Sequence, residues 1–165
     1  METEILAWDR KSVAVIRAIY DRHMGRTAFS AELVAALSDE SLQVGASWLL
    51  KYHFEQGERL TQPQVDAVYA QLPIFAHWET KLHILQSMAY MPIGETISAE
   101  VYQFVQQCLT DKKKFVRAWA YNGLYLLAKQ HGEYEAEARQ KLDAAMRKES
   151  GSIKARARNI FKEWG

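Results

Sequence analysis

The sequence predicts an all-α fold, an α-α superhelix of about four helical hairpins preceded by one amino-terminal helix. Apolar residues recur at helical spacing along most of the chain, and the alternating apolar and polar runs that form strands are absent. Only three prolines and eight glycines occur, too few for a chain folded through many tight β-turns. A polar turn followed by an apolar helix is clearest at 111–128 and returns, less closely, at 39–52 and 151–164. A helix that is apolar on most sides needs several neighbours, and the repetition indicates that these are copies of the same unit.

The predicted elements are a capping helix and four hairpins, with bounds 1–25, 30–57, 62–91, 98–131 and 133–165. The capping helix is predicted as one element because Ile5, Ile16 and Tyr20 recur at helical spacing. In the first hairpin, Ser30 is a suitable cap for the helix that follows it, and Gly57 ends the second helix.

Prolines and glycines separate the remaining hairpins. Pro63 suits the first turn of a helix, and Pro73 should bend or end that helix. Pro92 stops the second hairpin and Gly132 stops the third, while Gly151 divides the two helices of the fourth.

The second helices of the four hairpins align with one another. Equivalent apolar places, at spacings of 38, 34 and 37 residues, hold Val44, Leu82, Val116 and Ile153. A place two residues later is small in three of the four helices, which allows close packing between them; it holds Ala46, Ile84, Ala118 and Ala155.

In the third hairpin, Asp111 in the turn, Val116 and then Arg117 make the chain resemble HEAT-repeat proteins over 30–165. The resemblance implies that a turn aspartate and a basic residue form a structural ladder between neighbouring repeats. It assigns Asp111 and Arg117 to that ladder, and Asp39 keeps the acidic place in the first hairpin. The first two hairpins depart from the pattern at the basic place, which holds Gly45 and His83. The fourth keeps the basic place with Lys154 but has Lys148 at the acidic place.

Residues four apart on a helix share a face. Starting from the basic place, the four rows are Gly45-Leu49-His53, His83-Ser87-Met91, Arg117-Tyr121-Tyr125 and Lys154-Arg158-Lys162. By the resemblance, second helices line a concave face, so the candidate binding residues are Arg117, Tyr121, Tyr125, Lys154, Arg158, His83 and His53. The alternative is that Tyr121 and Tyr125 are packing residues and Arg117 is only a ladder residue.

Charge is unevenly distributed along the chain. Residues 1–111 carry 8 Lys and Arg against 14 Asp and Glu, whereas residues 112–165 carry 13 against 6. The basic end could face an acidic partner or the acidic end of another copy. The alternative is that these charges only solvate helix surfaces.

Length and composition favour one soluble domain over 1–165, with 48% apolar and 25% charged residues. The single cysteine, Cys108, lies in an apolar run and is interpreted as a small buried side chain. The acidic amino terminus lacks a signal-peptide pattern and no apolar run is long enough for a membrane span, so we expect a cytoplasmic protein that does not contact membranes.

The sequence favours a non-enzymatic scaffold that binds a protein or peptide on the concave face. No metal or cofactor site is predicted, because His77 and His83 are six residues apart and do not share a helix face, and no glycine-rich phosphate loop occurs. The tryptophans are spread one per layer, which indicates packing; they are Trp8, Trp48, Trp78, Trp119 and Trp164.

The alternative partner is nucleic acid, bound by the basic end of the chain. A distant similarity to HEAT-like DNA glycosylases, which act on alkylated bases, would place tryptophans, an aspartate and an arginine in a concave cleft. The predicted rows hold an arginine and tyrosines but no carboxylate. A protein or peptide partner is therefore favoured over nucleic acid.

Overall fold

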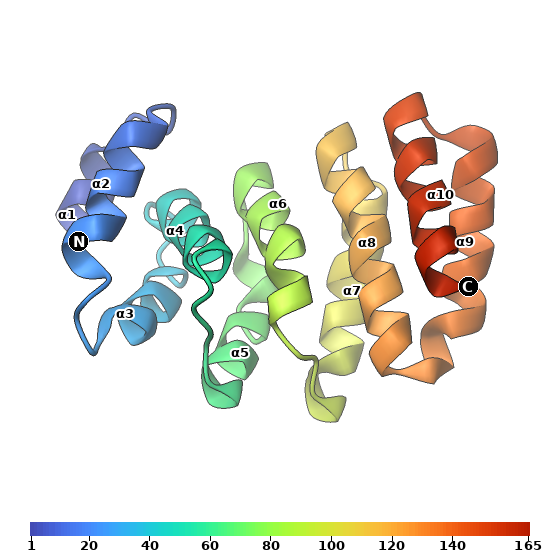
Figure 1. Cartoon of the computed structure of the whole chain (residues 1–165), viewed down its shortest axis with the longest axis horizontal. Helices are drawn as coiled ribbons and strands as arrows, with labels where there is room; N and C mark the ends of the chain where they lie inside the picture. Colours follow the sequence, from blue (N-terminus) through green and yellow to red (C-terminus); the bar gives the residue numbers. More distant parts are fainter. The chain divides into compact units, whose positions relative to one another are not determined.

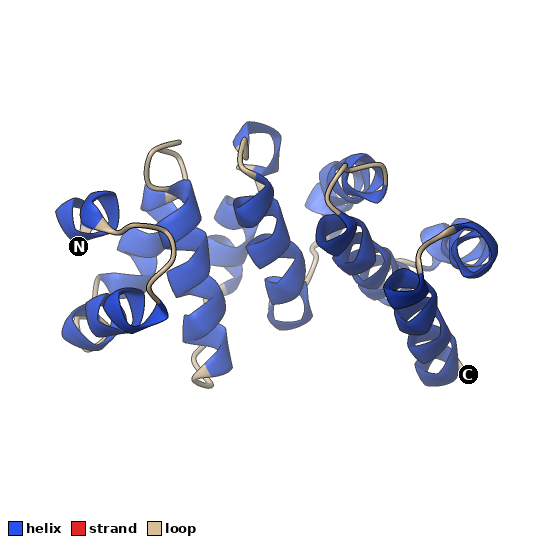
Figure 2. Cartoon of the chain, turned by 90° about the horizontal axis from the view of Figure 1, so that it is seen from above, coloured by secondary structure: helices blue, strands red, loops and turns tan.

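The computed structural model describes all 165 residues and contains ten α-helices and four short 3-10 turns. Figure 2 shows helices joined by loops and no strand, so the all-α prediction is confirmed. The chain divides into two compact units, Met1–Pro92 and Ile93–Gly165, here called the N-terminal and C-terminal units. Each is described by itself. The division falls between the second and third predicted hairpins, and a single domain over 1–165 stays a prediction.

The N-terminal unit holds six α-helices and two 3-10 turns: α1 (Glu2–Ala7), α2 (Val13–His23), α3 (Phe29–Ala36), α4 (Gln43–Glu55), α5 (Gln62–Tyr69), η1 (Leu72–Ile74), α6 (Trp78–Ser87) and η2 (Met88–Tyr90). The second helices of its two hairpins, α4 and α6, pack against each other, and so do the first helices, α3 and α5. Both α1 and α2 pack against α4 (Figure 1).

The amino-terminal segment forms two helices, so the prediction of one unbroken helix was wrong. Between α1 and α2, the Asp9 carboxylate accepts hydrogen bonds from the backbone N–H groups of Lys11 (2.9 Å) and Ser12 (2.8 Å). Arg10 adopts a left-handed conformation with φ of 59°, and Ser12 then caps α2 with its side chain. The helix stops here because side chains form hydrogen bonds with the local backbone. The apolar residues keep their helical spacing across the break, so the apolar pattern does not reveal it.

In the second hairpin, both prolines lie where the sequence predicted them. Thr61 and Gln64 form a capping box at the start of α5, with Pro63 in its first turn. Pro73 lies in η1, beyond the end of α5, as expected for a residue that cannot continue a helix.

The C-terminal unit holds four α-helices and two 3-10 turns: η3 (Glu95–Ile97), α7 (Ser98–Leu109), α8 (Lys114–Gln130), η4 (Gly132–Tyr134), α9 (Glu135–Lys148) and α10 (Gly151–Trp164). α7 packs on α8 and α9 packs on α10, which makes two hairpins, and α8 also packs against α9 and α10. The second helices, α8 and α10, therefore lie side by side (Figure 1).

Polar and aromatic contacts join the first helices of these hairpins. The Tyr102 hydroxyl of α7 donates to Glu137 of α9 (2.6 Å), and the Tyr102 ring stacks on Tyr134 with centroids 4.8 Å apart. The hydrogen bond to Glu137 raises the pKa of Tyr102 to about 12. The two hairpins are thus connected through α7 and α9 as well as through α8 and α10.

Two contacts hold α1 in place. Glu4 accepts hydrogen bonds from His23 and from Arg22 Nε (2.8 Å), and these bonds lower the pKa of Glu4 to about 2. Ile5 is buried against Gly45 of α4, where an added Cβ would lie 2.4 Å from Ile5 Cγ2. The glycine at this basic place of the repeat therefore leaves room for α1.

We expect Gly45→Ala to lower the free energy of unfolding by about 1–3 kcal/mol, because the new methyl group must displace Ile5 or α1. On an Ile5→Ala background the same change should cost nothing, since the space is then empty and alanine favours helix over glycine by about 1 kcal/mol. Urea unfolding followed by far-UV circular dichroism measures both effects. Gly151→Ala is the matched control, because a Cβ there meets no atom within 4 Å. Equal losses on both backgrounds would contradict the contact.

Candidate functional site

α8 is buried on all sides but one. Nine of its 17 residues are buried, and they include Tyr121, Leu124 and Ala128. Phe115, Trp119, Asn122 and Leu126 keep partial or full exposure and recur at spacings of four, three and four residues, so they share one face. α8 therefore presents a single open stripe.

α10 repeats this stripe, and a hollow lies beside it. Residues 152, 156, 159 and 163 follow the four stripe residues of α8 by 37 positions, the spacing that also separates Val116 from Ile153. A hollow of about 300 Å³ is lined by Asn122 of α8 and by six residues of α10; we call it the α8–α10 pocket, and the α10 residues are Ser152, Ala155, Arg156, Asn159, Ile160 and Glu163.

A cation–π contact adjoins the α8–α10 pocket through Arg156, one of the residues that line it. The guanidinium carbon of Arg156 lies 3.9 Å from the ring centroid of Trp119. Arg156 forms no hydrogen bond and no ion pair with another residue. Burial lowers the pKa of the Arg156 guanidinium, the charge of Glu163 opposes the shift, and an arginine stays charged in either case.

Two asparagines occupy equivalent places on the two helices. Asn122 is half-buried and Asn159 is exposed, and the side chain of neither forms a hydrogen bond within the protein. A carboxamide can donate two hydrogen bonds and accept two. The pocket therefore offers free donors and acceptors on both of its helices.

The predicted row on α8 has a different role. Arg117 pairs with Glu149, which follows α9, through Nε to Oε1 (3.3 Å) and Nη2 to Oε2 (3.4 Å). Its Nη1 also donates to the Asp111 carbonyl oxygen (2.8 Å). Arg117 thus joins the two hairpins, with Glu149 as its acidic partner.

Tyr121 and Tyr125 lie along the same row and are buried, at 8% and 5% exposure. Burial, and then the charge of Glu149, raises the pKa of Tyr121. The ring of Tyr125 meets Trp164 of α10 edge-on, with centroids 5.0 Å apart. These two tyrosines therefore give a partner almost no surface, and the alternative reading of them as packing residues fits their positions.

The remaining predicted residues of α10 lie away from the pocket. Lys154 is half-buried, and Arg158 and Lys162 are exposed. They fall on a different face of α10 from Arg156 and Asn159, because successive residues of a helix are turned by about 100°.

The predicted histidines lie in the N-terminal unit. His53 is 4% exposed, with Nδ1 3.0 Å from the Tyr20 hydroxyl, and burial lowers its pKa. His83 is half-buried, with Nδ1 2.9 Å from Ser47 Oγ. Burial, and then the charge of Lys51, lowers the pKa of His83 to about 4. Both histidines bond other side chains of the unit rather than standing open.

The two aspartates of the predicted ladder bond within their own turns. Asp39 Oδ1 accepts from the N–H (2.9 Å) and hydroxyl (2.6 Å) of Ser41, and Asp111 Oδ1 accepts from the N–H of Lys113 (2.8 Å). Neither carboxylate forms an ion pair with a neighbouring hairpin. Their observed role is to shape the turn before a second helix.

The sequence-based search missed the stack and the asparagine pair. Trp119 was grouped with packing tryptophans, yet only Trp8 is buried, and the other four are half-buried. Arg156 stood out only as one of several basic residues near the carboxyl end. The signal that could have found the site is the equal spacing of Asn122 and Asn159 in the repeat.

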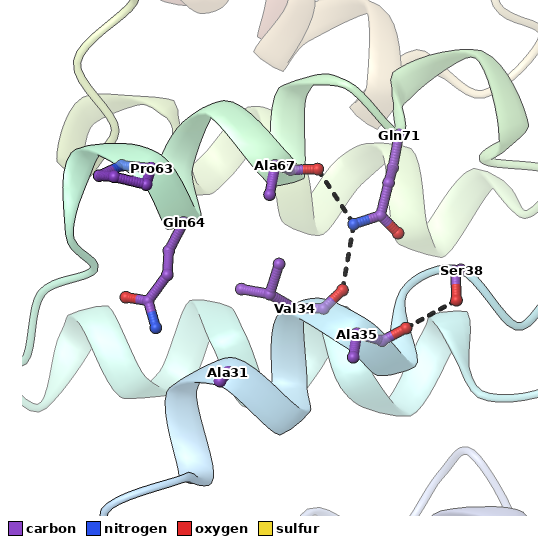
Figure 3. Close-up of a pocket in the computed structure, with 8 residues that line it drawn as sticks. All are labelled: Ala31, Val34, Ala35, Ser38, Pro63, Gln64, Ala67 and Gln71. Atoms are coloured by element: carbon purple, nitrogen blue, oxygen red, sulfur yellow. Dashed lines mark hydrogen bonds between the residues drawn. The ribbon is translucent and has the colours of Figure 1, made fainter.

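A second hollow lies between α3 and α5 of the N-terminal unit (Figure 3). Its volume is about 410 Å³, and it is lined by Ala31, Val34, Ala35, Ser38, Pro63, Gln64, Ala67 and Gln71. Gln71 Nε2 closes one end by donating to the carbonyl oxygens of Val34 (3.1 Å) and Ala67 (3.0 Å). Small apolar side chains dominate this lining, and it holds no charged group.

Other kinds of site have little support. No three His, Cys, Asp or Glu side chains gather where they could hold a metal ion, and Cys108 is buried. None of the helices combines the length and the apolar character that crossing a membrane requires.

We expect Glu149→Gln to lower the free energy of unfolding by about 1 kcal/mol, because a bidentate pair with side chains only 23% and 19% exposed loses its charge. Asp143→Asn is the matched control. Asp143 pairs with Arg147 within α9, at side chains that are 48% and 71% exposed, so its loss should be close to zero. Urea unfolding in low salt compares the two variants. Equal losses would show that Arg117–Glu149 does not join the hairpins energetically.

We expect His83 to make stability depend on pH between about 6.5 and 4. The folded protein keeps His83 neutral down to about pH 4, whereas the unfolded chain binds the proton near pH 6.5. Stability therefore falls as the pH drops through this window, by about 2–3 kcal/mol, and His83→Gln should remove that part of the fall. Urea midpoints measured from pH 8 to pH 4 test this. His53, whose pKa is lowered in the same direction, leaves a residual slope. A slope unchanged in His83→Gln would contradict the assignment.

Comparison with known proteins adds no assignment: neither the protein-family models, nor the curated proteins, nor the solved structures include a match to this chain.

Proposed function

We propose that the protein is a non-enzymatic interaction module that binds a peptide segment of a partner along the open stripe of α8 and α10. The observation that carries the proposal is the α8–α10 pocket, where Arg156, Asn122 and Asn159 have hydrogen-bonding groups without partners in the protein. Peptide backbones offer N–H donors and C=O acceptors at regular spacing, which carboxamide side chains can match.

The proposal keeps the predicted surface type but changes the residues. Second helices remain the binding elements, while the stripe of Trp119 and Asn122 replaces the row of Arg117, Tyr121 and Tyr125. Tryptophan and arginine are the residue types most enriched at the energetic centres of interfaces. We further propose that the hairpins are HEAT-like repeats, which is supported by the packing of α4 on α6 and of α8 on α10.

Nucleic acid is the alternative occupant, and one observation favours it. Arg156 and Glu163 line the pocket and Trp119 contacts Arg156 beside it, which resembles the set expected from the distant similarity to HEAT-like DNA glycosylases, with a glutamate in place of the aspartate. Two features favour a peptide instead. Arg156 covers a face of Trp119 on which a base could stack, and Glu163 would repel a phosphate.

The test selects phage-displayed random peptides on the immobilised full chain and measures the affinity of the enriched peptides as synthetic molecules. Asn122→Ala with Asn159→Ala should weaken binding about thirtyfold, because two hydrogen bonds of about 1 kcal/mol each are lost. Gln107→Ala, at an exposed amide on α7, is the matched control and should bind as the wild type does. Circular dichroism checks that every variant is folded.

Two outcomes would contradict the proposal. Either no peptide is enriched, or the enriched peptides bind the double asparagine variant as tightly as the wild type. A gel shift with a single-stranded oligonucleotide, lost steeply as salt rises and lost in Arg156→Gln, would support the nucleic-acid alternative instead.

A further inference from the structure

The most unusual charged group of the C-terminal unit is Arg156. The other arginines of this unit have carboxylate partners: Arg117 pairs with Glu149, Arg139 with Glu135 and Arg147 with Asp143, and the exception besides Arg156 is the exposed Arg158. Arg156 is half-buried and has no such partner. A guanidinium that has lost part of its water without gaining a counterion is held at a cost, which a bound anion would offset.

The stack on Trp119 prepares this guanidinium for one kind of ligand. A guanidinium lying on an aromatic ring uses its face for the ring and keeps the N–H groups of its edge for hydrogen bonds in its plane. A carboxylate matches two parallel N–H groups of that edge. The 3.9 Å contact restricts the side chain before any ligand arrives, so less conformational freedom is lost on binding.

We propose that the bound peptide carries a carboxylate that pairs with Arg156, while Asn122 and Asn159 bond its backbone amides. This inference rests on the proposed function and names the chemistry of the partner. The carboxylate is either an Asp or Glu side chain or the free carboxyl end of the peptide, and both present the same two oxygens.

Glu163 narrows the choice of anion. Its carboxylate lines the same pocket, four residues and so about one helical turn beyond Asn159 in the stripe of α10, and its charge acts on Arg156. A second negative group tolerates a ligand with a single charge better than a phosphate, which carries a charge of about −1.5 to −2 at neutral pH. The site therefore fits a carboxylate rather than a phosphorylated side chain.

The experiment uses the peptides selected on the full chain. We expect the enriched sequences to share an Asp or Glu, or a free carboxyl end. Replacing the acidic side chain by its amide, or amidating the carboxyl end, identifies which source supplies the group, and the responsible change should weaken binding at least about tenfold. Arg156→Gln should weaken binding of the unmodified peptide to the same extent. Combining Arg156→Gln with the neutral peptide should add no further loss, because the two changes remove one interaction.

Arg158→Gln is the matched control, since Arg158 lies two residues away on the same helix but on another face. Circular dichroism and urea midpoints confirm that Arg156→Gln stays folded. The inference is overturned if peptides that need Asn122 and Asn159 carry no acidic group, or bind Arg156→Gln unchanged; the proposed function then survives. It is also overturned if a phosphoserine in place of the acidic residue binds more tightly than the carboxylate. Peptides indifferent to the asparagines and to Arg156 alike would remove both proposals.

Discussion

The Arg117–Glu149 pair is the ion pair that joins the two helical hairpins of the C-terminal unit, and the candidate site depends on how those hairpins are joined. It ties the start of α8 to the turn between α9 and α10, and Arg117 also bonds the backbone of its own turn. A pair at that end favours one register of α10 against α8, together with the packing between the two helices. The equal spacing of the two stripes then brings Trp119 beside Arg156. The candidate site is therefore a consequence of register, which a pair of charged side chains outside the site helps to set.

The sequence predicted the helical class and most of the hairpin ends well, because apolar spacing and capping residues act locally. Ser30 is an exception, because it lies inside α3, which begins at Phe29 after an Ala28 cap. The break after α1 was missed although its cause is also local. Asp9 and Ser12 are capping residue types, but the apolar positions on either side continue one helical pattern across them. The acidic partner of Arg117 was missed for another reason. A fixed repeat register placed Lys148 where the acid should stand, and the glutamate that pairs with Arg117 is one residue later.

Tyr121 and Tyr125 were predicted to face a partner and are buried, because periodicity identifies rows of a helix without saying which row faces a neighbour. On α8 most rows are apolar or aromatic, so the pattern gave no reason to prefer Trp119 and Asn122 over Arg117 and Tyr121. Packing decides this, since Tyr121 lies near Glu149 and Tyr125 meets Trp164. A polar residue of the same type at the same place in two repeats can mark an open row. Asn122 and Asn159 are such residues, and a search for polar identity at the repeat spacing could have found them.

A binding site needs polar groups that are both free and within reach, and the two units differ in this respect. In the N-terminal unit, His53 and His83 are paired with other side chains, and the buried polar atoms without a partner, Gln71 Oε1 and Thr80 Oγ1, are shut away from solvent. In the C-terminal unit, Arg156 and the two asparagines have no hydrogen-bond or ion-pair partner in the protein and remain partly exposed. Water can satisfy such groups, and a ligand can replace that water without breaking any bond of the fold. Arg117 and the buried tyrosines hold the hairpins together from outside the pocket, and the side chains of Asn122 and Asn159 bond no other residue. Their chemistry can therefore change to suit a partner while the fold is kept.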